Sequence, residues 1–550
     1  MPTLSVLRPA RRLLVAAIPF LLLPPGPTRA QEHAHDEGAE VIGTVHFATS
    51  CAAAAQAPFD RGVAKLHSFW FESATAEFSA AAAADADCAM AHWGIAMTAW
   101  GNPMARSAPS ADQTTRALDA LGRAQSLASA ATPREQAYVE AAAALWREHE
   151  TVGHLERMKR HEDALRAIVE ANPDDTEARA FLGRIMVANA EPDDLTFARQ
   201  QQAAEILLPL FETQPQHPGL AHYIIHAFDA PPIAGEGLAA AMRYAEIAPA
   251  APHALHMPSH IFTRLGYWDE SIETNRRSAE ASPEPDAAVH PLDYMVYAYL
   301  QQGRDGAAAE VIGRIASVDD PYYGRIMGYN AVAMPARYAL ERGDWEAAAA
   351  LPTPEDALAW VEAVPRFARA VGAARSGRPE MARADIDRLK VLEDDLAQSG
   401  EEDWAVRVGA QRLAAEAWAL WAEGDQAGAL DLARRAADLE ETVEKHPVTP
   451  GPLLPARELQ ADMLLESGDA AGALATYEAT LVREPRRARA LYGAGVAAQR
   501  AGDAAAAARH AGALLELMDR ADPTRPEPAW ARSVVRSVAP PSASGERASG

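Results

Sequence analysis

The chain of 550 residues is long enough for several domains or for one extended repeat array. Hydrophobic residues make up 49% and charged residues 23%, a globular balance that excludes a wholly disordered chain and a polytopic membrane protein. The net charge of −25 disfavours nucleic acid as a partner, because an acidic protein repels the phosphate backbone. Two cysteines exclude a disulfide scaffold and an iron–sulfur cluster of the usual kind.

Residues 1–30 have the layout of a secretory signal peptide. Basic residues precede an apolar run, Leu13–Leu23, and small residues follow it up to Ala30. A membrane-spanning helix needs about 20 apolar residues, so the run predicts a cleaved signal and no membrane span in the mature protein. We expect cleavage near Ala30 and a periplasmic or secreted protein. Cys51 and Cys88 are then candidate disulfide partners, a pairing that the sequence leaves open.

The rest of the chain is predicted to be a helical array between two irregular ends. Helical apolar spacing recurs through residues 59–518, and alternating strand patterns are almost absent. A lead-in segment is expected at 31–58. Residues 519–550 are rich in Pro, Ser, Arg and Gly and are expected to form a flexible tail.

Prolines mark a repeat within the array. Pro215, Pro249 and Pro283 are each 34 residues apart. Glycines such as Gly266 and Gly303 occur where two helices of a pair would turn and cross closely. A 34-residue period with a proline after the second helix resembles the tetratricopeptide repeat. This resemblance implies an all-α fold, a tetratricopeptide-repeat α-solenoid of stacked helical hairpins.

The histidines carry the most unusual pattern in the sequence. Seven of the seventeen lie between residues 217 and 290. They recur at steps of three or four residues, which places side chains on one face of a helix. Pro258 interrupts the helix that carries two of them and predicts a kink. With two aspartates at the same steps, the candidate metal ligands are His222, His226, Asp229, His253, His256, His260, His290 and Asp293.

The repeat register gives these side chains a direction. In tetratricopeptide proteins the corresponding positions of the first helices line a concave groove, so the resemblance implies a histidine-rich groove at 217–297. Tyr294, Tyr297 and Arg337 are expected to face the same groove. These three are candidate contacts for a small-molecule substrate, a peptide or a protein partner.

Imidazoles on matched helix faces indicate metal chemistry. Imidazole suits zinc, copper, iron and nickel, and three or four nitrogens with a carboxylate can complete a site. Histidines four residues apart, such as His256 and His260, can bind one ion together, and six histidines suffice for two ions. We expect zinc or copper. The alternative is a groove of neutral histidines hydrogen-bonded to tyrosines and to a bound peptide.

Longer motifs carry a family resemblance. HYIIHAFD at 222–229 and HALHMPSHIFTRLG at 253–266 are similar to signatures of exported bacterial tetratricopeptide proteins of poorly defined function. Further stretches of this kind are FWFE at 69–72, CAMAHWG at 88–94 and HPVTPG at 446–451. The resemblance covers most of residues 46–515. It implies the fold and export, with no reaction to carry over.

Two hypotheses about function follow. The first is a binding protein that holds zinc or copper, a peptide or a protein partner in the groove. The second is a metal-dependent hydrolase or oxidase with its metal site on the groove histidines. Helical repeat arrays usually bind rather than catalyse, which favours the first, whereas the density of ionisable groups on one face favours the second. Of the two we favour the binding protein.

Overall fold

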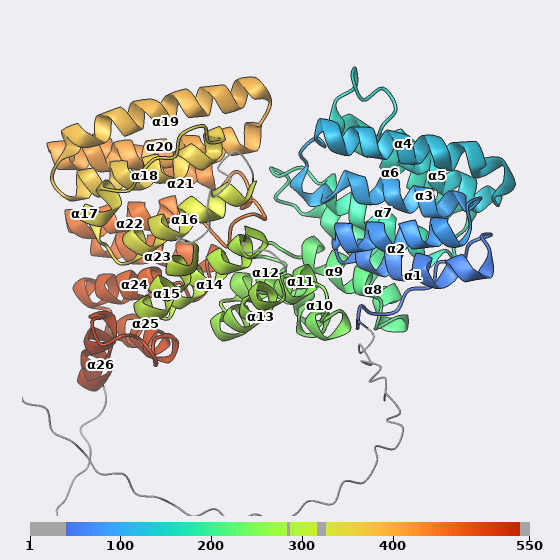
Figure 1. The fold of residues 1–550 in the computed structure, drawn as a ribbon. Coiled ribbons are helices and arrows are strands. Elements are labelled where there is room, and N and C mark those ends of the chain that lie inside the picture. The colour runs from blue at the N-terminus through green and yellow to red at the C-terminus, as the bar shows by residue number, and fades with distance from the viewer. Residues whose placement is uncertain (1–39, 283–285, 316–325, 539–550) are drawn as a thin grey trace, which may run out of the picture. The chain divides into compact units, whose positions relative to one another are not determined.

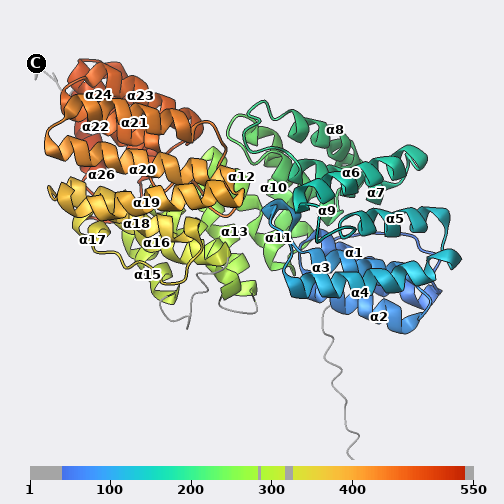
Figure 2. The ribbon, with the colours of Figure 1, turned by 90° about the horizontal axis from the view of Figure 1, so that it is seen from above.

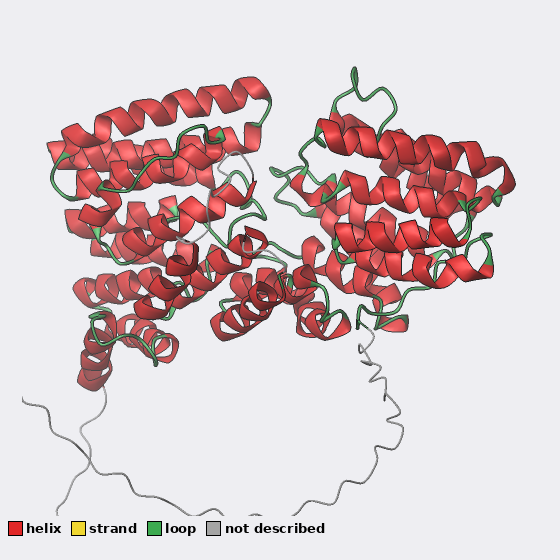
Figure 3. Ribbon diagram, viewed as in Figure 1, coloured by secondary structure: helices red, strands yellow, loops and turns green. Residues whose placement is uncertain are grey.

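The computed structural model describes residues 40–282, 286–315 and 326–538. Those residues form helices joined by loops and turns, with no strand among them (Figure 3). The predicted fold class, an all-α solenoid of stacked helical hairpins, is confirmed. By its internal contacts the chain divides into residues 1–40 and 41–550, and the description that follows concerns the second unit. The predicted signal peptide, its cleavage position and residues 31–39 of the lead-in lie outside the described residues.

The N-terminal helices pack against their neighbours in the chain (Figure 1). Two of them begin with a capping box, in which a Ser or Thr side chain and a side chain three residues later satisfy free backbone N–H groups. The elements are α1 (Ala53–His67), α2 (Phe71–Ala84), α3 (Ala89–Trp100), η1 (Pro103–Ala105), α4 (Ala111–Leu127), η2 (Ala128–Ala130), α5 (Pro133–Ala144), α6 (His154–Ala171), α7 (Thr176–Ala188) and α8 (Ala198–Thr213).

The middle of the chain carries shorter helices. Pro258 lies at the junction of two of them, because a proline has no N–H to continue the hydrogen bonds of the preceding turn. The kink predicted there is therefore a break, centred on Met257. The elements are α9 (Pro218–Ala227), α10 (Ala234–Ile247), α11 (Pro252–His256), α12 (Pro258–Leu265), α13 (Trp268–Ala281), η3 (Asp286–Ala288), α14 (Val289–Gln301) and α15 (Asp305–Ile315).

The C-terminal helices are longer and stack in chain order. Figures 1 and 2 both show α18 to α21 side by side. The elements are α16 (Ile326–Glu341), α17 (Trp345–Ala349), α18 (Ala359–Arg375), α19 (Pro379–Ser399), α20 (Glu402–Glu423), α21 (Gln426–Glu440), α22 (Ala456–Ser467), α23 (Ala470–Arg483), α24 (Ala488–Ala501), α25 (Ala504–Leu517) and α26 (Glu527–Val538).

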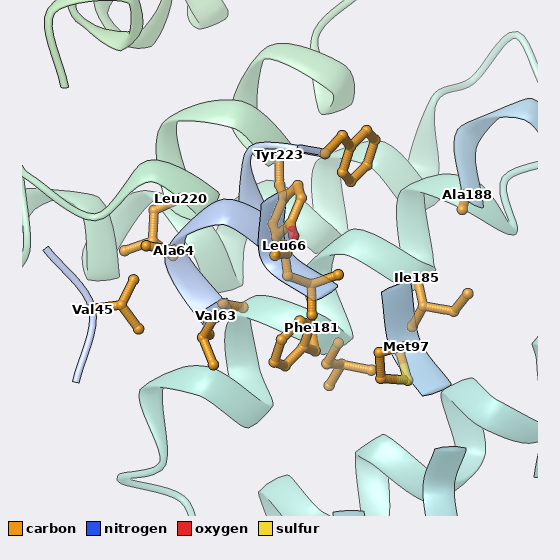
Figure 4. Packing of buried hydrophobic residues seen from close by; sticks show 14 of the residues in the cluster. Val45, Val63, Ala64, Leu66, Met97, Phe181, Ile185, Ala188, Leu220 and Tyr223 are labelled. Carbon is orange, nitrogen blue, oxygen red and sulfur yellow. The ribbon is translucent and has the colours of Figure 1, made fainter. Parts of the chain in front are cut away.

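A hydrophobic core joins α1 to the first helix that carries candidate ligands, α9. Figure 4 shows Leu66 of α1, Phe181 of α7 and Tyr223 of α9 meeting in this core, and all three side chains are buried. Burying such large side chains contributes about 1.5–3 kcal/mol each. The core therefore fixes α9 against the C-terminal end of α1, where His67 lies.

The ends of the helical array extend beyond the predicted limits of 59 and 518. Helix α1 begins at Ala53, and the residues before it pack on the array, with Phe47 buried against Tyr138 at a ring distance of 4.8 Å. Helix α26 lies inside the segment predicted to be a flexible tail. Its Ala531 and Val534 are buried, because α26 covers the apolar face of the last hairpin. Residues 539–550 of that segment lie outside the described residues.

The C-terminal part of the chain packs against helices from the middle of the chain. Gly266 ends α12 with a φ of +71°, and a Cβ there would lie 2.7 Å from the carbonyl oxygen of Pro485. Next to it, the indole N–H of Trp268 donates to the carbonyl of Arg486 over 3.3 Å. Only glycine combines this backbone conformation with such a close approach. The solenoid thus packs its last hairpins against α12 to α14.

The segment between α21 and α22, residues 441–455, packs against α16 and α14. Asn330 of α16 donates to the carbonyl of Val448 over 2.7 Å, and Arg337 donates to the carbonyl of Gly451 over 2.8 Å. Tyr294 of α14 donates to the carbonyl of Thr449 over 3.2 Å. Such contacts satisfy the backbone of a segment that has no regular structure of its own.

Cys51 and Cys88 form a disulfide that ties the lead-in to the start of α3, across a sequence separation of 37 residues. The cross-link lowers the entropy of the unfolded chain, which is the usual source of its stabilising effect.

None of the helices in the described residues is both long and apolar enough to cross a membrane.

We expect a Cys51→Ser/Cys88→Ser variant to lose about 2–4 kcal/mol of stability, because a loop of this length is no longer closed in the unfolded chain. Urea unfolding followed by circular dichroism measures the loss. Wild type treated with a reductant should show the same lower midpoint. An unchanged midpoint in both samples would contradict a stabilising disulfide.

Candidate metal centre

The first set of histidines comes from α9 and α11. His222 and His226 lie one turn apart on α9, and His253 reaches them from α11. The Nε2 atom of His222 lies 3.1 Å from the Nε2 atoms of both partners. The register of α9 is set at its first turn, where His217 caps the helix and Pro218 occupies a position that needs no N–H.

The second set lies beside the first. His256 ends α11, His260 lies on α12, and His290 reaches them from α14. The Nε2 atoms of His256 and His260 are 3.0 Å apart, and the rings of His256 and His290 are 4.5 Å apart. In each set, the three candidate ligand atoms lie within 4.8 Å of one another.

The other nitrogen of three rings is held by an acceptor. His222 Nδ1 donates to the carbonyl of His67 over 2.6 Å, and His260 Nδ1 donates to the carboxylate of Asp229 over 2.8 Å. His256 Nδ1 donates to Asn275 Oδ1 over 2.6 Å. The amide of Asn275 is oriented by its own Nδ2, which donates to the carbonyl of Ser271. Metal-binding histidines are commonly fixed by outer partners of this kind.

These bonds decide which nitrogen carries the proton. A carbonyl, an amide oxygen and an ionised carboxylate accept hydrogen bonds and cannot donate them. The proton of each neutral ring therefore sits on Nδ1, and the Nε2 lone pair points into the centre. For His222, one of its two neighbours, His226 or His253, can donate to this single lone pair. For His256 and His260, two lone pairs face each other at 3.0 Å.

Burial keeps the imidazoles neutral. It lowers the pKa of His222, His226, His253, His256 and His290 well below the usual value of 6.5, and the neighbouring imidazoles lower it further. Burial also lowers the pKa of His260, although the carboxylate of Asp229 opposes this shift. Since only neutral imidazole binds a metal ion, the cluster is in its ligand form at neutral pH.

Aromatic rings pack against the histidines of the cluster. Phe69 stacks on His253 at 5.3 Å and contacts His222 edge-on at 4.4 Å. Tyr294 lies 5.0 Å from His256 and 5.1 Å from His260. Phe69 has a φ of +52°, a conformation that is unfavourable for a bulky side chain. Such strain is concentrated at functional sites, where the surrounding structure holds it in place.

The two predicted aspartates do not point at the cluster as ligands. Asp229 lies behind His260 and also pairs with Lys445 and Arg264. Asp293 forms a fully buried ion pair with Arg337 at 3.1 Å. The carboxylates thus support the histidines or the fold, and the direct candidate ligands are the six imidazoles.

The predicted contact residues have other partners. Tyr294 donates to the carbonyl of Thr449 over 3.2 Å, and Tyr297 accepts from Arg487 over 3.2 Å. Both tyrosine side chains and that of Arg337 are buried. Residues 441–455 lie beside the predicted groove at 217–297, where Thr449 contacts Tyr294 and Lys445 contacts Asp229, whereas His226, His253 and His290 are only half-buried.

Several important neighbours were absent from the sequence prediction. They are Phe69, His67, Asn275, Arg264 and Lys445. The motifs at 69–72 and 446–451 pointed towards two of these regions without assigning them a role. Nothing in the sequence connects Asn275, on the second helix of its hairpin, to His256.

A third group of three candidate ligands contains His67, His217 and Glu177, and it is already satisfied by hydrogen bonds. Nε2 of both histidines bonds to the Glu177 carboxylate, over 2.8 and 2.9 Å. The hydroxyl of Tyr223 bonds to Nδ1 of His67, and the N–H of Leu220 donates to Nδ1 of His217. Every ring nitrogen has a partner of the right kind. This group therefore positions His67, whose carbonyl holds His222.

A cavity of about 80 Å³ adjoins the outer side of Asp229. Lys445 and Arg264 line it together with the stacked pair Trp360 and Trp404, whose rings are 4.6 Å apart. Glu440 also faces the cavity, where burial next to other carboxylates raises its pKa to about 7. The cavity combines this aromatic pair with charged side chains.

Comparisons with known proteins add little to this geometry. No protein-family model matches the chain, and no curated protein does. The crystal structure of yeast Tom70 is similar at 13% identity and a TM-score of 0.29, over 88% of this chain and 95% of that chain. The crystal structure of the APC/C hetero-tetramer Cut9–Hcn1 is similar at 11% identity and a TM-score of 0.33, over 88% and 76%. At these values the likenesses assign no function.

We expect Arg337→Met to destabilise the protein by about 3–5 kcal/mol, because Asp293 would be left as an unpaired buried charge. Urea unfolding measures the effect. An Arg337→Met/Asp293→Leu double variant should recover part of the loss, since neither charge remains. If the single and double variants were equally unstable, the ion pair would not be the cause.

The stability of the protein should depend on Glu440. Its pKa in the folded state, about 7, lies above the usual 4.5, so the folded protein keeps a proton that the unfolded chain releases. The free energy of unfolding therefore falls as the pH rises from 4.5 to 7. We expect Glu440→Gln to be more stable than wild type by about 1–3 kcal/mol at pH 8, with no difference near pH 4. Urea unfolding at both pH values tests this, and an equal gain at pH 4 would rule out titration.

Proposed function

We propose that the six-histidine cluster is a metal centre that binds zinc or copper. The observation that carries the proposal is the pair of Nε2 lone pairs of His256 and His260, 3.0 Å apart in a buried site. Two such lone pairs repel each other unless a cation lies between them. A proton could serve, but the lowered pKa values of both rings oppose it.

The ligand chemistry favours zinc or copper over magnesium or calcium. Imidazole nitrogen suits the former pair, whereas the latter prefer oxygen ligands. Three histidines around an ion leave a coordination position open, which is the arrangement of catalytic rather than structural zinc sites. That feature favours the second hypothesis, a metal-dependent hydrolase or oxidase, over a purely structural ion.

A protein or peptide partner is the other candidate ligand of this fold, because stacked helical hairpins offer extended surfaces for such partners. The histidines that such a partner could reach are the half-buried ones, His226, His253 and His290. Export of the protein is part of the same proposal. It is supported by the signal-like layout of residues 1–30 and by the disulfide between Cys51 and Cys88.

Metal analysis of the purified protein tests the proposal. Wild type should carry zinc or copper in stoichiometric amounts after dialysis, and His256→Ala/His260→Ala should lose it. His46→Ala removes an exposed histidine and serves as the matched control. Asn275→Ala should weaken binding about 10–100-fold, because His256 loses its outer partner. Bound metal should also raise the melting temperature of wild type.

A folded wild-type protein that binds neither ion more tightly than the double variant would falsify the metal centre. The histidines would then be a buried hydrogen-bonded network. Circular dichroism must show that each variant folds. If the double variant does not, His290→Gln replaces a half-buried histidine and should still weaken binding.

A further inference from the structure

The six histidines form two separate three-histidine sites rather than one site. Each set combines two histidines four residues apart with a third from another element, and the candidate ligand atoms fall into two groups. The first set is anchored through His222 and the second through His256 and His260. On the proposed metal-binding function, we infer that the centre is dinuclear, with one ion in each set.

The ligand atoms separate the two sets more clearly than the ring centres do. The three ligand atoms of each set lie within 4.8 Å of one another, and the two sets share no histidine. The rings of His226 and His260, and those of His253 and His256, meet across the boundary at 6.1 Å. Because one ion with nitrogen ligands at about 2.0–2.1 Å binds three or four imidazoles, six imidazoles grouped in this way fit two ions.

The two sets adjoin, with rings 6.1 Å apart across the boundary, so two ions would lie side by side. Two-metal sites hold their ions about 3.5–4 Å apart and stabilise a group bound between them. Within the part of the chain that the structure describes, the boundary is formed by imidazoles, and the carboxylate of Asp229 faces His260 Nδ1 on the outer side. The bridge would therefore be a small exogenous anion or a solvent-derived hydroxide.

Charge supports such a bridge. The six ligands are neutral, and the nearest carboxylate, Asp229, is already balanced by Lys445 and Arg264. Two divalent ions would bring four positive charges into a buried site with no compensation from the ligands. Burying unpaired charge is costly, so the site favours a bound anion between the ions.

Copper is the probe that tests the inference, because two Cu(II) ions that share a bridge couple their electron spins. Metal-free protein is loaded with Cu(II), dialysed and analysed for copper per chain and for its EPR signal. Wild type should bind two ions per chain, and its integrated EPR signal should fall far short of the bound copper. The variants are His226→Ala and His290→Ala, which change one half-buried histidine in each set.

Each variant should bind one ion per chain and give an EPR signal that accounts for all of it. The His46→Ala control should behave as wild type. One ion per wild-type chain, lost in both variants, would overturn the dinuclear centre and leave the metal-binding proposal intact. Two ions with a full, uncoupled signal would overturn the shared bridge. No bound copper or zinc at all would overturn the proposed function itself. If either variant fails to fold, the wild-type stoichiometry and signal still decide between one ion and two.

Discussion

The carboxylate of Asp229 is the interaction on which the centre depends. One oxygen accepts from His260 Nδ1 and from Lys445 Nζ, over 2.8 and 3.1 Å, and the other accepts from Arg264 over 3.0 Å. All of these side chains are almost completely buried. Because Lys445 belongs to residues 441–455, the same carboxylate orients a candidate ligand and holds that segment beside the histidines.

The helical architecture could be predicted because its signal is local and repeated. The 34-residue period and the small residues at turns depend on contacts between neighbours in the chain, which sequence patterns describe well. The histidine faces could be predicted for the same reason. His222 and His226 share a helix face by spacing alone, and so do His256 and His260, even though Pro258 breaks the helix between them.

The surroundings of the histidines could not be predicted, because they come from distant parts of the chain. The register gave the direction of the side chains but not what fills the space in front of them. That space is taken by Thr449 and its neighbours, about 150 residues after Tyr294. Likewise, the sequence offered Asp293 as a ligand, and only the return of α16 supplies Arg337 as its buried partner.

The contrast between the two kinds of buried histidine group explains why the metal-binding proposal rests on hydrogen-bond geometry and not on histidine number alone. Around Glu177, His67 and His217 have acceptors and donors in balance, and no ion is needed. Around His256 and His260 the acceptors all lie on the Nδ1 side, so both protons point away from the centre. A buried hydrogen-bonded network would place at least one donor inward. An arrangement that removes the protons from the interior and leaves only lone pairs there suits a cation.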